Sequence, residues 1–173
     1  LAYSKPGYAM RVLREVVLGE DRFDDAFREY IRRWSFKTPR PEDFFRTMED
    51  AAGADLSWFW RGWFYESASL DQAVASVQPS ARRGRVVITL ANLDRMVMPA
   101  DVLVTYDDGT EEMRRLPVEA WARTNSFPMA WDADGRTIVR VEVDPEQRLP
   151  DMDRWNNVWE AADNEANSAD TPE

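Results

Sequence analysis

The sequence contains no cysteine and no histidine among its 173 residues. Without cysteine it has no disulfides, no thiolate metal sites and no cysteine nucleophile, although this absence does not fix the compartment. Without histidine it lacks the usual general base near neutral pH, the commonest zinc ligand and the central member of a Ser-His-Asp triad. This chain by itself therefore lacks the side chains that most hydrolase mechanisms require.

Long apolar runs are also missing. No stretch approaches the roughly 20 apolar residues that a membrane helix needs, so no membrane segment is expected. A formal net charge of −10 argues against nucleic acid or an anionic membrane as a partner, because both would repel an acidic surface. The chain begins Leu-Ala-Tyr, with neither an initiator Met nor a leader sequence, and we interpret it as a segment of a longer protein.

Hydrophobic residues make up 44% of the chain and aromatic residues 12%. Within the first 66 residues, apolar residues recur with helical spacing in four segments. Gly19 and Gly53 are the expected ends of the first and third helices, and Asp55 is the expected N-cap of the fourth. Short loops between four helices predict an antiparallel helical layer. The expected core positions are Ala9, Val12, Leu13, Val16 and Val17; Phe23, Phe27, Tyr30, Ile31 and Trp34; Phe44, Phe45, Met48 and Ala52; Leu56, Phe59, Trp60, Trp63 and Phe64.

From about residue 70 the apolar period changes from 3.6 to 2. In the run 86–91 the residues at 86, 88 and 90 are apolar, and most of the residues between them are apolar as well. This pattern predicts a strand with both faces covered. Asp107-Asp108-Gly109 predicts a hairpin turn between strands at 102–106 and 111–116. Another alternating strand is expected over 137–143. Short strands separated by turn signals predict a small antiparallel β-sandwich.

These patterns predict an α+β fold, in which a helical subdomain of about four helices precedes a small antiparallel β-sandwich. The expected boundaries are 1–68 for the helical part, 69–150 for the sandwich and 151–173 for an acidic tail. Nothing after Trp159 is apolar enough to anchor a core, so the end of the tail is expected to be disordered.

A set of motifs runs in a defined order from residue 3 to residue 65. They are Tyr3-Ser4-Lys5-Pro6-Gly7, Leu18-Gly19, Ala26-Phe27, Asp43-Phe44-Phe45, Gly53-Ala54-Asp55-Leu56 and Phe59-Trp60-Arg61-Gly62-Trp63-Phe64-Tyr65. Their order and spacing resemble the end of the catalytic domain in aminopeptidase-N-like (gluzincin) zinc metallopeptidases, in particular a bacterial branch. Shorter motifs in the β region, such as Asp144-Pro145, look like the same branch.

The resemblance implies a zinc enzyme in which a His-Glu-x-x-His helix and a downstream Glu hold the metal, and the motif Glu acts as base on the zinc-bound water. It also implies a tyrosine that donates its hydroxyl to the oxyanion of the tetrahedral intermediate. By motif match that tyrosine is Tyr3, with Tyr8 as a near neighbour. The zinc-binding motif is absent from this chain, and Lys5-Pro6-Gly7 replaces the family's direct Lys-Gly. Lys5 either orients the site or is merely solvated.

The resemblance therefore implies the C-terminal part of a zinc aminopeptidase, inactive by itself. It would contribute a wall of the active-site cleft and Tyr3 to the release of N-terminal residues from peptides. The zinc, the base and the contacts to the substrate amine would come from an upstream catalytic portion, the expected partner, and no cofactor is expected in this chain. An isolated helical layer would expose an apolar face, so self-association or a partner chain is expected. The alternatives are a non-catalytic interaction module and a nicked enzyme made of two chains.

Three other features have structural readings beside functional ones. One interpretation of the aromatic run 58–64 is a platform for carbohydrate or peptide. Its helical spacing favours the other interpretation, in which the run belongs to the core, with Trp58 and Arg61 lying off the apolar stripe. The adjacent carboxylates at 24–25, 107–108 and 111–112 resemble acid–base pairs but fall at a helix surface and a hairpin, which favours solvation. The basic run 82–85 is better explained by a turn with solvated arginines than by phosphate binding.

Overall fold

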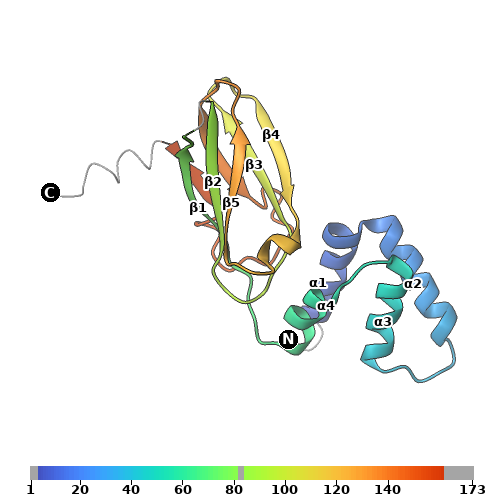
Figure 1. Ribbon diagram of the computed structural model, residues 1–173. Coiled ribbons are helices and arrows are strands. Elements are labelled where there is room, and N and C mark those ends of the chain that lie inside the picture. Colours follow the sequence, from blue (N-terminus) through green and yellow to red (C-terminus); the bar gives the residue numbers. More distant parts are fainter. Residues whose placement is uncertain (1–3, 82–83, 162–173) are drawn as a thin grey trace. The chain divides into compact units, whose positions relative to one another are not determined.

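The computed structural model describes residues 4–81 and 84–161 (Figure 1). The chain separates into two compact units, Leu1–Ala68 and Ser69–Glu173. Helices make up the first unit, and antiparallel strands in two sheets make up the second. The predicted α+β class is therefore confirmed. Within the described ranges, no helix is both long enough and apolar enough to cross a membrane.

The helical unit contains α1 (Ser4–Val12), α2 (Glu20–Trp34), α3 (Pro41–Ala52) and α4 (Ser57–Trp60). Local sequence signals set most of these limits. Pro41 occupies the first turn of α3, where its missing N–H costs no helical hydrogen bond. The Asp43 carboxylate accepts the Arg40 N–H at 2.9 Å, which caps the start of α3. Gly53 ends the same helix in the left-handed conformation, with φ 59°, as predicted.

Two helices end in wider turns than the periodicity indicated. The stretch after α1 is the π-helical η1 (Leu13–Leu18), and the stretch after α4 is the π-helical η2 (Arg61–Tyr65). The predicted N-cap of α4 is displaced, because α4 begins at Ser57 with Leu56 in the cap position. The Asp55 carboxylate nevertheless accepts the Ser57 N–H at 2.9 Å, so it still satisfies a free donor of the first turn.

Polar side chains tie the helices to one another. The Arg22 guanidinium on α2 donates to the carbonyls of Ala52 at 2.6 Å and Gly53 at 3.1 Å, which closes the end of α3. Glu49 accepts the N–H of Leu56 at 3.0 Å and the indole N–H of Trp60 at 3.2 Å. These bonds satisfy backbone groups at helix ends that would otherwise lack partners.

The expected core stripe of α2 is only partly buried. Phe23 is 7% exposed, but Phe27 is 41% and Ile31 is 49% exposed, so their assignment to the core was wrong. Helical spacing identifies an apolar stripe, whereas burial requires a neighbour along its whole length. Helix α2 packs on α3 and on η1, and these contacts leave the Phe27–Ile31 side uncovered.

The β unit is a sandwich of two antiparallel sheets, a three-stranded sheet in the order β1-β2-β5 and a four-stranded sheet in the order β4-β3-β6-β7. The strands are β1 (Gln72–Pro79), β2 (Arg85–Asn92), β3 (Ala100–Tyr106), β4 (Glu111–Leu116), β5 (Ser126–Asp132), β6 (Ile138–Val143) and β7 (Val158–Glu160). The predicted hairpin joins β3 to β4, with Gly109 at φ 79° in its turn.

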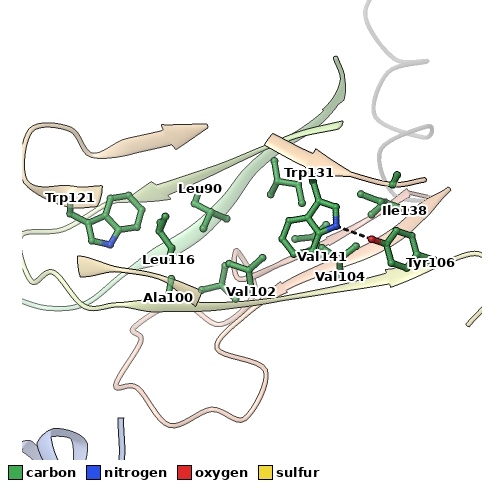
Figure 2. Close-up of a cluster of buried hydrophobic side chains, with 13 residues drawn as sticks. Leu90, Ala100, Val102, Val104, Tyr106, Leu116, Trp121, Trp131, Ile138 and Val141 are labelled. Atoms are coloured by element: carbon green, nitrogen blue, oxygen red, sulfur yellow. Dashed lines mark hydrogen bonds between the residues drawn. The ribbon is translucent and has the colours of Figure 1, made fainter. Parts of the chain in front are cut away.

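The sandwich core lies between the two sheets (Figure 2). Towards one end of this core the indole N–H of Trp131 donates a hydrogen bond to the hydroxyl of Tyr106 at 2.8 Å. That hydroxyl in turn donates to Glu112 at 2.9 Å, and burial raises the pKa of Tyr106. Both aromatic rings are fully buried, so the hydrogen bond removes the cost of burying their polar atoms without partners.

Tertiary contacts changed several strand expectations. Ile88 and Leu90 of β2 are buried, whereas on the other face Val87 and Thr89 are half-buried and Ala91 is buried, so that face is covered in part. A register shift near Tyr106 places Ile138 rather than Val139 opposite Tyr106, so Ile138 is the buried residue at the start of β6.

The sandwich also continues past the boundary that the sequence suggested at residue 150. Strand β7 pairs with β6, and the buried Asn157 precedes it. The part of the expected tail from 162 to 173 lies outside the described residues.

Candidate functional site

The one predicted catalytic residue, Tyr3, lies outside the residues that the structure describes. The next residue, Ser4, opens α1, so the motif that contains Tyr3 continues directly into a helix. Lys5 is half-buried in the first turn, and Pro6 lies in that turn, where proline is tolerated. The inserted proline of the Lys5-Pro6-Gly7 motif is therefore compatible with an unbroken α1.

Helix α1 is attached to the last of the ordered motifs, which runs from Phe59 to Tyr65. The ring of Tyr8 packs on the indole of Trp63, with ring centroids 6.0 Å apart and planes tilted by 51°. Trp63 belongs to η2 and is 5% exposed. Contacts between α1 and η2 thus bring together two segments that are more than 50 residues apart in the sequence. The start of α1 is consequently positioned by the aromatic end of the helical unit.

The aromatic run 58–64 is mostly buried in the core, which agrees with the prediction from its helical spacing. Phe59, Trp60 and Trp63 are each at most 5% exposed, and Trp60 stacks on Phe45 with centroids 4.4 Å apart. Phe64 is an exception at 37% exposure. The two off-stripe residues also differ from each other: Trp58 is half-buried and donates its indole N–H to the Asp55 carbonyl, whereas Arg61 is exposed.

None of the three carboxylate pairs forms an acid–base dyad. Asp24 accepts two hydrogen bonds from Arg14, at 2.8 and 3.0 Å, and these lower the pKa of its carboxyl group. Asp108 accepts the Thr110 hydroxyl and the Thr110 N–H in the β3–β4 turn, and these two bonds lower its pKa as well. Glu112 accepts from Arg114 and Tyr106; although burial opposes ionisation, these bonds hold its pKa below the usual range. Asp24, Asp108 and Glu112 therefore have structural partners that favour their ionised forms.

A zinc ion does not fit the residues of this chain. The sequence supplies neither histidine nor cysteine, and the described ranges contain no group of three or more acidic side chains that could hold a metal. The basic run 82–85 falls half outside the described residues, since Arg82 and Arg83 are among those that the structure does not describe. Arg85 is exposed and lies 3.6 Å from Asp132.

Sequence reasoning missed one surface feature. Trp155 is 92% exposed and lines a hollow on the β unit. It was assigned to the acidic tail because its neighbours are polar. A tryptophan within a polar, acidic stretch was the available signal, because its ring has a large apolar face and its indole N–H can donate a hydrogen bond.

Residues 1–63 match the model of the Peptidase family M1 domain. The whole fold is similar to aminopeptidase A of Legionella pneumophila, solved in complex with aspartic acid, with a TM-score of 0.60 and 15% sequence identity. That alignment covers 87% of this chain but 17% of the Legionella protein, so the chain spans a small part of that enzyme's length. No curated protein matches the chain. The structural likeness therefore extends through both units, while the family match is confined to the helical one.

Proposed function

We propose that this chain is the C-terminal part of a metallo-aminopeptidase, in which the helical unit forms one wall of the active-site cleft. The match of residues 1–63 to the Peptidase family M1 domain carries the proposal. It covers the same residues as the ordered motifs from Tyr3 to Tyr65. The similarity in fold to an aminopeptidase supports an arrangement in which a β-sandwich follows these helices.

Tyr3 is the catalytic residue of this proposal. Its hydroxyl would donate a hydrogen bond to the oxyanion that forms when the peptide carbonyl becomes tetrahedral, a role that lowers the barrier by stabilising developing charge. Helix α1, which begins at Ser4, would hold the tyrosine from one side, and the Tyr8–Trp63 contact fixes that helix on η2. The metal and the general base would come from an upstream portion, because the sequence has no histidine or cysteine and residues 4–81 and 84–161 contain no acidic cluster that fits zinc.

Reconstitution tests the proposal. The 173-residue chain is mixed with the protein segment encoded upstream of Leu1, and hydrolysis of aminoacyl-anilides is measured with each part alone and with both. We expect activity only in the mixture, because the tyrosine and the metal site are on different parts. Hydrolysis by this chain alone would contradict the proposal. A zinc-loaded mixture without activity would instead favour the non-catalytic interaction module.

The exposed side of α2 predicts self-association or capture of a partner chain. Phe27 and Ile31 lie one helical turn apart and are more than 40% exposed, and Phe36, in the loop after α2, is fully exposed with a positive φ of 61°. A bulky side chain in the left-handed region is unfavourable in free solution, and such residues concentrate at functional surfaces. The upstream portion of the same protein is the proposed occupant.

We expect the isolated chain to self-associate at high concentration, as measured by light scattering, and Ile31→Lys together with Phe36→Ser to reduce the average mass towards that of a monomer. Leu93→Lys is the matched control, because Leu93 is 58% exposed on the other unit. A wild-type chain that stays monomeric at high concentration, or an equal effect of the control, would contradict this prediction.

A further inference from the structure

A hollow on the β unit lies beside the exposed Trp155. It has a volume of about 270 Å³, and a second hollow of about 310 Å³ shares Arg140, Arg154, Trp155 and Val158 with it. The two adjoin and form one depression beside β7, the edge strand of the four-stranded sheet, and the neighbouring part of β6. Its volume is sufficient for one or two small rings of a ligand.

Trp155 is held in its exposed position by the loop that carries it. Its backbone N–H donates to the Asp153 carboxylate at 3.0 Å, and the Asp153 N–H donates to Asp151 at 3.1 Å. Asp151 in turn accepts the N–H of Gln72 at 2.8 Å, which ties the loop to β1. A loop anchored in this way keeps a large apolar ring exposed to water, although burial of such a ring is favourable. Such a ring is a flat platform available to a ligand.

The charges around the depression are already matched with one another. Arg140 is paired with Glu142 at 3.0 Å and with Glu160, and Arg154 is paired with Asp144 at 2.7 Å. Asp144 is 6% exposed and also accepts the backbone N–H of Leu149, so its carboxylate is fully engaged. The lining thus presents guanidinium donors and carboxylate acceptors side by side. Because these opposite charges are paired, they largely cancel, and the lining attracts a charged ligand only weakly.

A buried polar group without a partner adds to this lining. Asn157 is 2% exposed, and within the described part of the chain its side-chain oxygen has no hydrogen-bond partner. Buried amide oxygens nearly always accept a hydrogen bond, because leaving them unpaired costs free energy. A donor from a ligand or a bound water in the hollow would satisfy it.

We propose that this depression binds a neutral oligosaccharide. The apolar face of a sugar ring would stack on the Trp155 indole, and its hydroxyls would donate to Glu142 and Asn157 and accept from the arginines. Each hydroxyl both donates and accepts, which suits a lining of paired ions. A cationic peptide would meet Arg140 and Arg154, and an anion would meet Glu142 and Glu160, so a charged ligand gains less here. This site is independent of the proposed peptidase role.

The test uses the full chain labelled with ¹⁵N, titrated with maltohexaose, cellohexaose and chitohexaose, with trilysine and oligogalacturonate as charged comparisons. The indole N–H signal of Trp155, identified by its loss in Trp155→Phe, is expected to shift and saturate with at least one neutral sugar. Trp155→Ala should weaken that binding about tenfold or more, and Trp155→Tyr should retain most of it. No saturable shift with any neutral sugar, or a stronger response to trilysine, would overturn the proposal.

Two controls separate the site from general surface effects. Met152→Ala changes another exposed apolar side chain of the same loop, at 72% exposure, and does not alter the lining of the hollow. Binding should be unchanged in this variant. An equal loss in Met152→Ala and Trp155→Ala would show that the loop as a whole, rather than the indole, is responsible, and would overturn the proposed stacking.

Discussion

Replacement of Tyr3 by phenylalanine is expected to lower the turnover of the reconstituted enzyme by a factor on the order of 10²–10³, as loss of one oxyanion donor does. Substrate affinity should change little, because the hydroxyl acts on charge that develops only in the transition state. The measurement is kcat and KM for an aminoacyl-anilide in a mixture of this chain with its upstream portion. Equal zinc content in both mixtures must be verified.

Tyr8→Phe is the matched control for Tyr3→Phe. The two tyrosines are five positions apart in the sequence, but the Tyr8 ring packs on Trp63, and phenylalanine preserves that ring contact. We expect near-normal turnover in this variant. A large fall in turnover with Tyr8→Phe and none with Tyr3→Phe would move the oxyanion role to Tyr8. Normal turnover in both variants would remove the tyrosine from the proposed mechanism.

The second large effect concerns stability rather than turnover. Trp131→Ala is expected to destabilise the β unit by about 3–5 kcal/mol, the usual range for deleting a buried aromatic side chain. Trp131 is fully buried, and its loss would leave both a cavity and the Tyr106 hydroxyl without its indole donor (Figure 2). The free energy of unfolding is measured by urea denaturation, followed through NMR signals of the β unit so that the helical unit does not contribute.

Trp155→Ala is the matched control, because the same chemical change is made at a side chain that is 92% exposed. We expect an effect within about 0.5 kcal/mol, as is usual at surface positions. Tyr106→Phe should fall between the two, at about 1–3 kcal/mol, since it keeps the ring but leaves the Trp131 N–H buried without an acceptor. Equal costs for Trp131→Ala and Trp155→Ala would contradict the assignment of Trp131 to the core.

The helical unit was the more predictable half of the molecule. The effects of Pro41, Gly53 and Asp55 depend on residues next to them in the chain, so they could be predicted without the tertiary structure. Burial was less predictable: the stripe of α2 was identified, but the sequence did not reveal that Phe27 and Ile31 are uncovered. The wide turns η1 and η2 were also unexpected, because an α-helical and a π-helical turn differ little in sequence.

The β unit shows where local patterns fail. Strand β5 has Phe127, Met129 and Trp131 on its inner face, an alternation that was readable but is interrupted by Pro128. Proline is acceptable there because β5 is an edge strand, which is a property of the sheet and not of the segment. Strand β7 has three residues and is held by its pairing with β6 and by contacts with β1, both far away in the sequence.

The sequence by itself determined the α+β class, most helix limits, the β3–β4 hairpin and the absence of any histidine or cysteine to bind zinc. These properties depend on composition or on interactions between near neighbours in the chain. Only the tertiary structure decided which apolar residues are covered, that residues 151–160 belong to the sandwich, and that Trp155 stands exposed beside a lined hollow. Each of these depends on contacts between residues far apart in sequence, which no local pattern records.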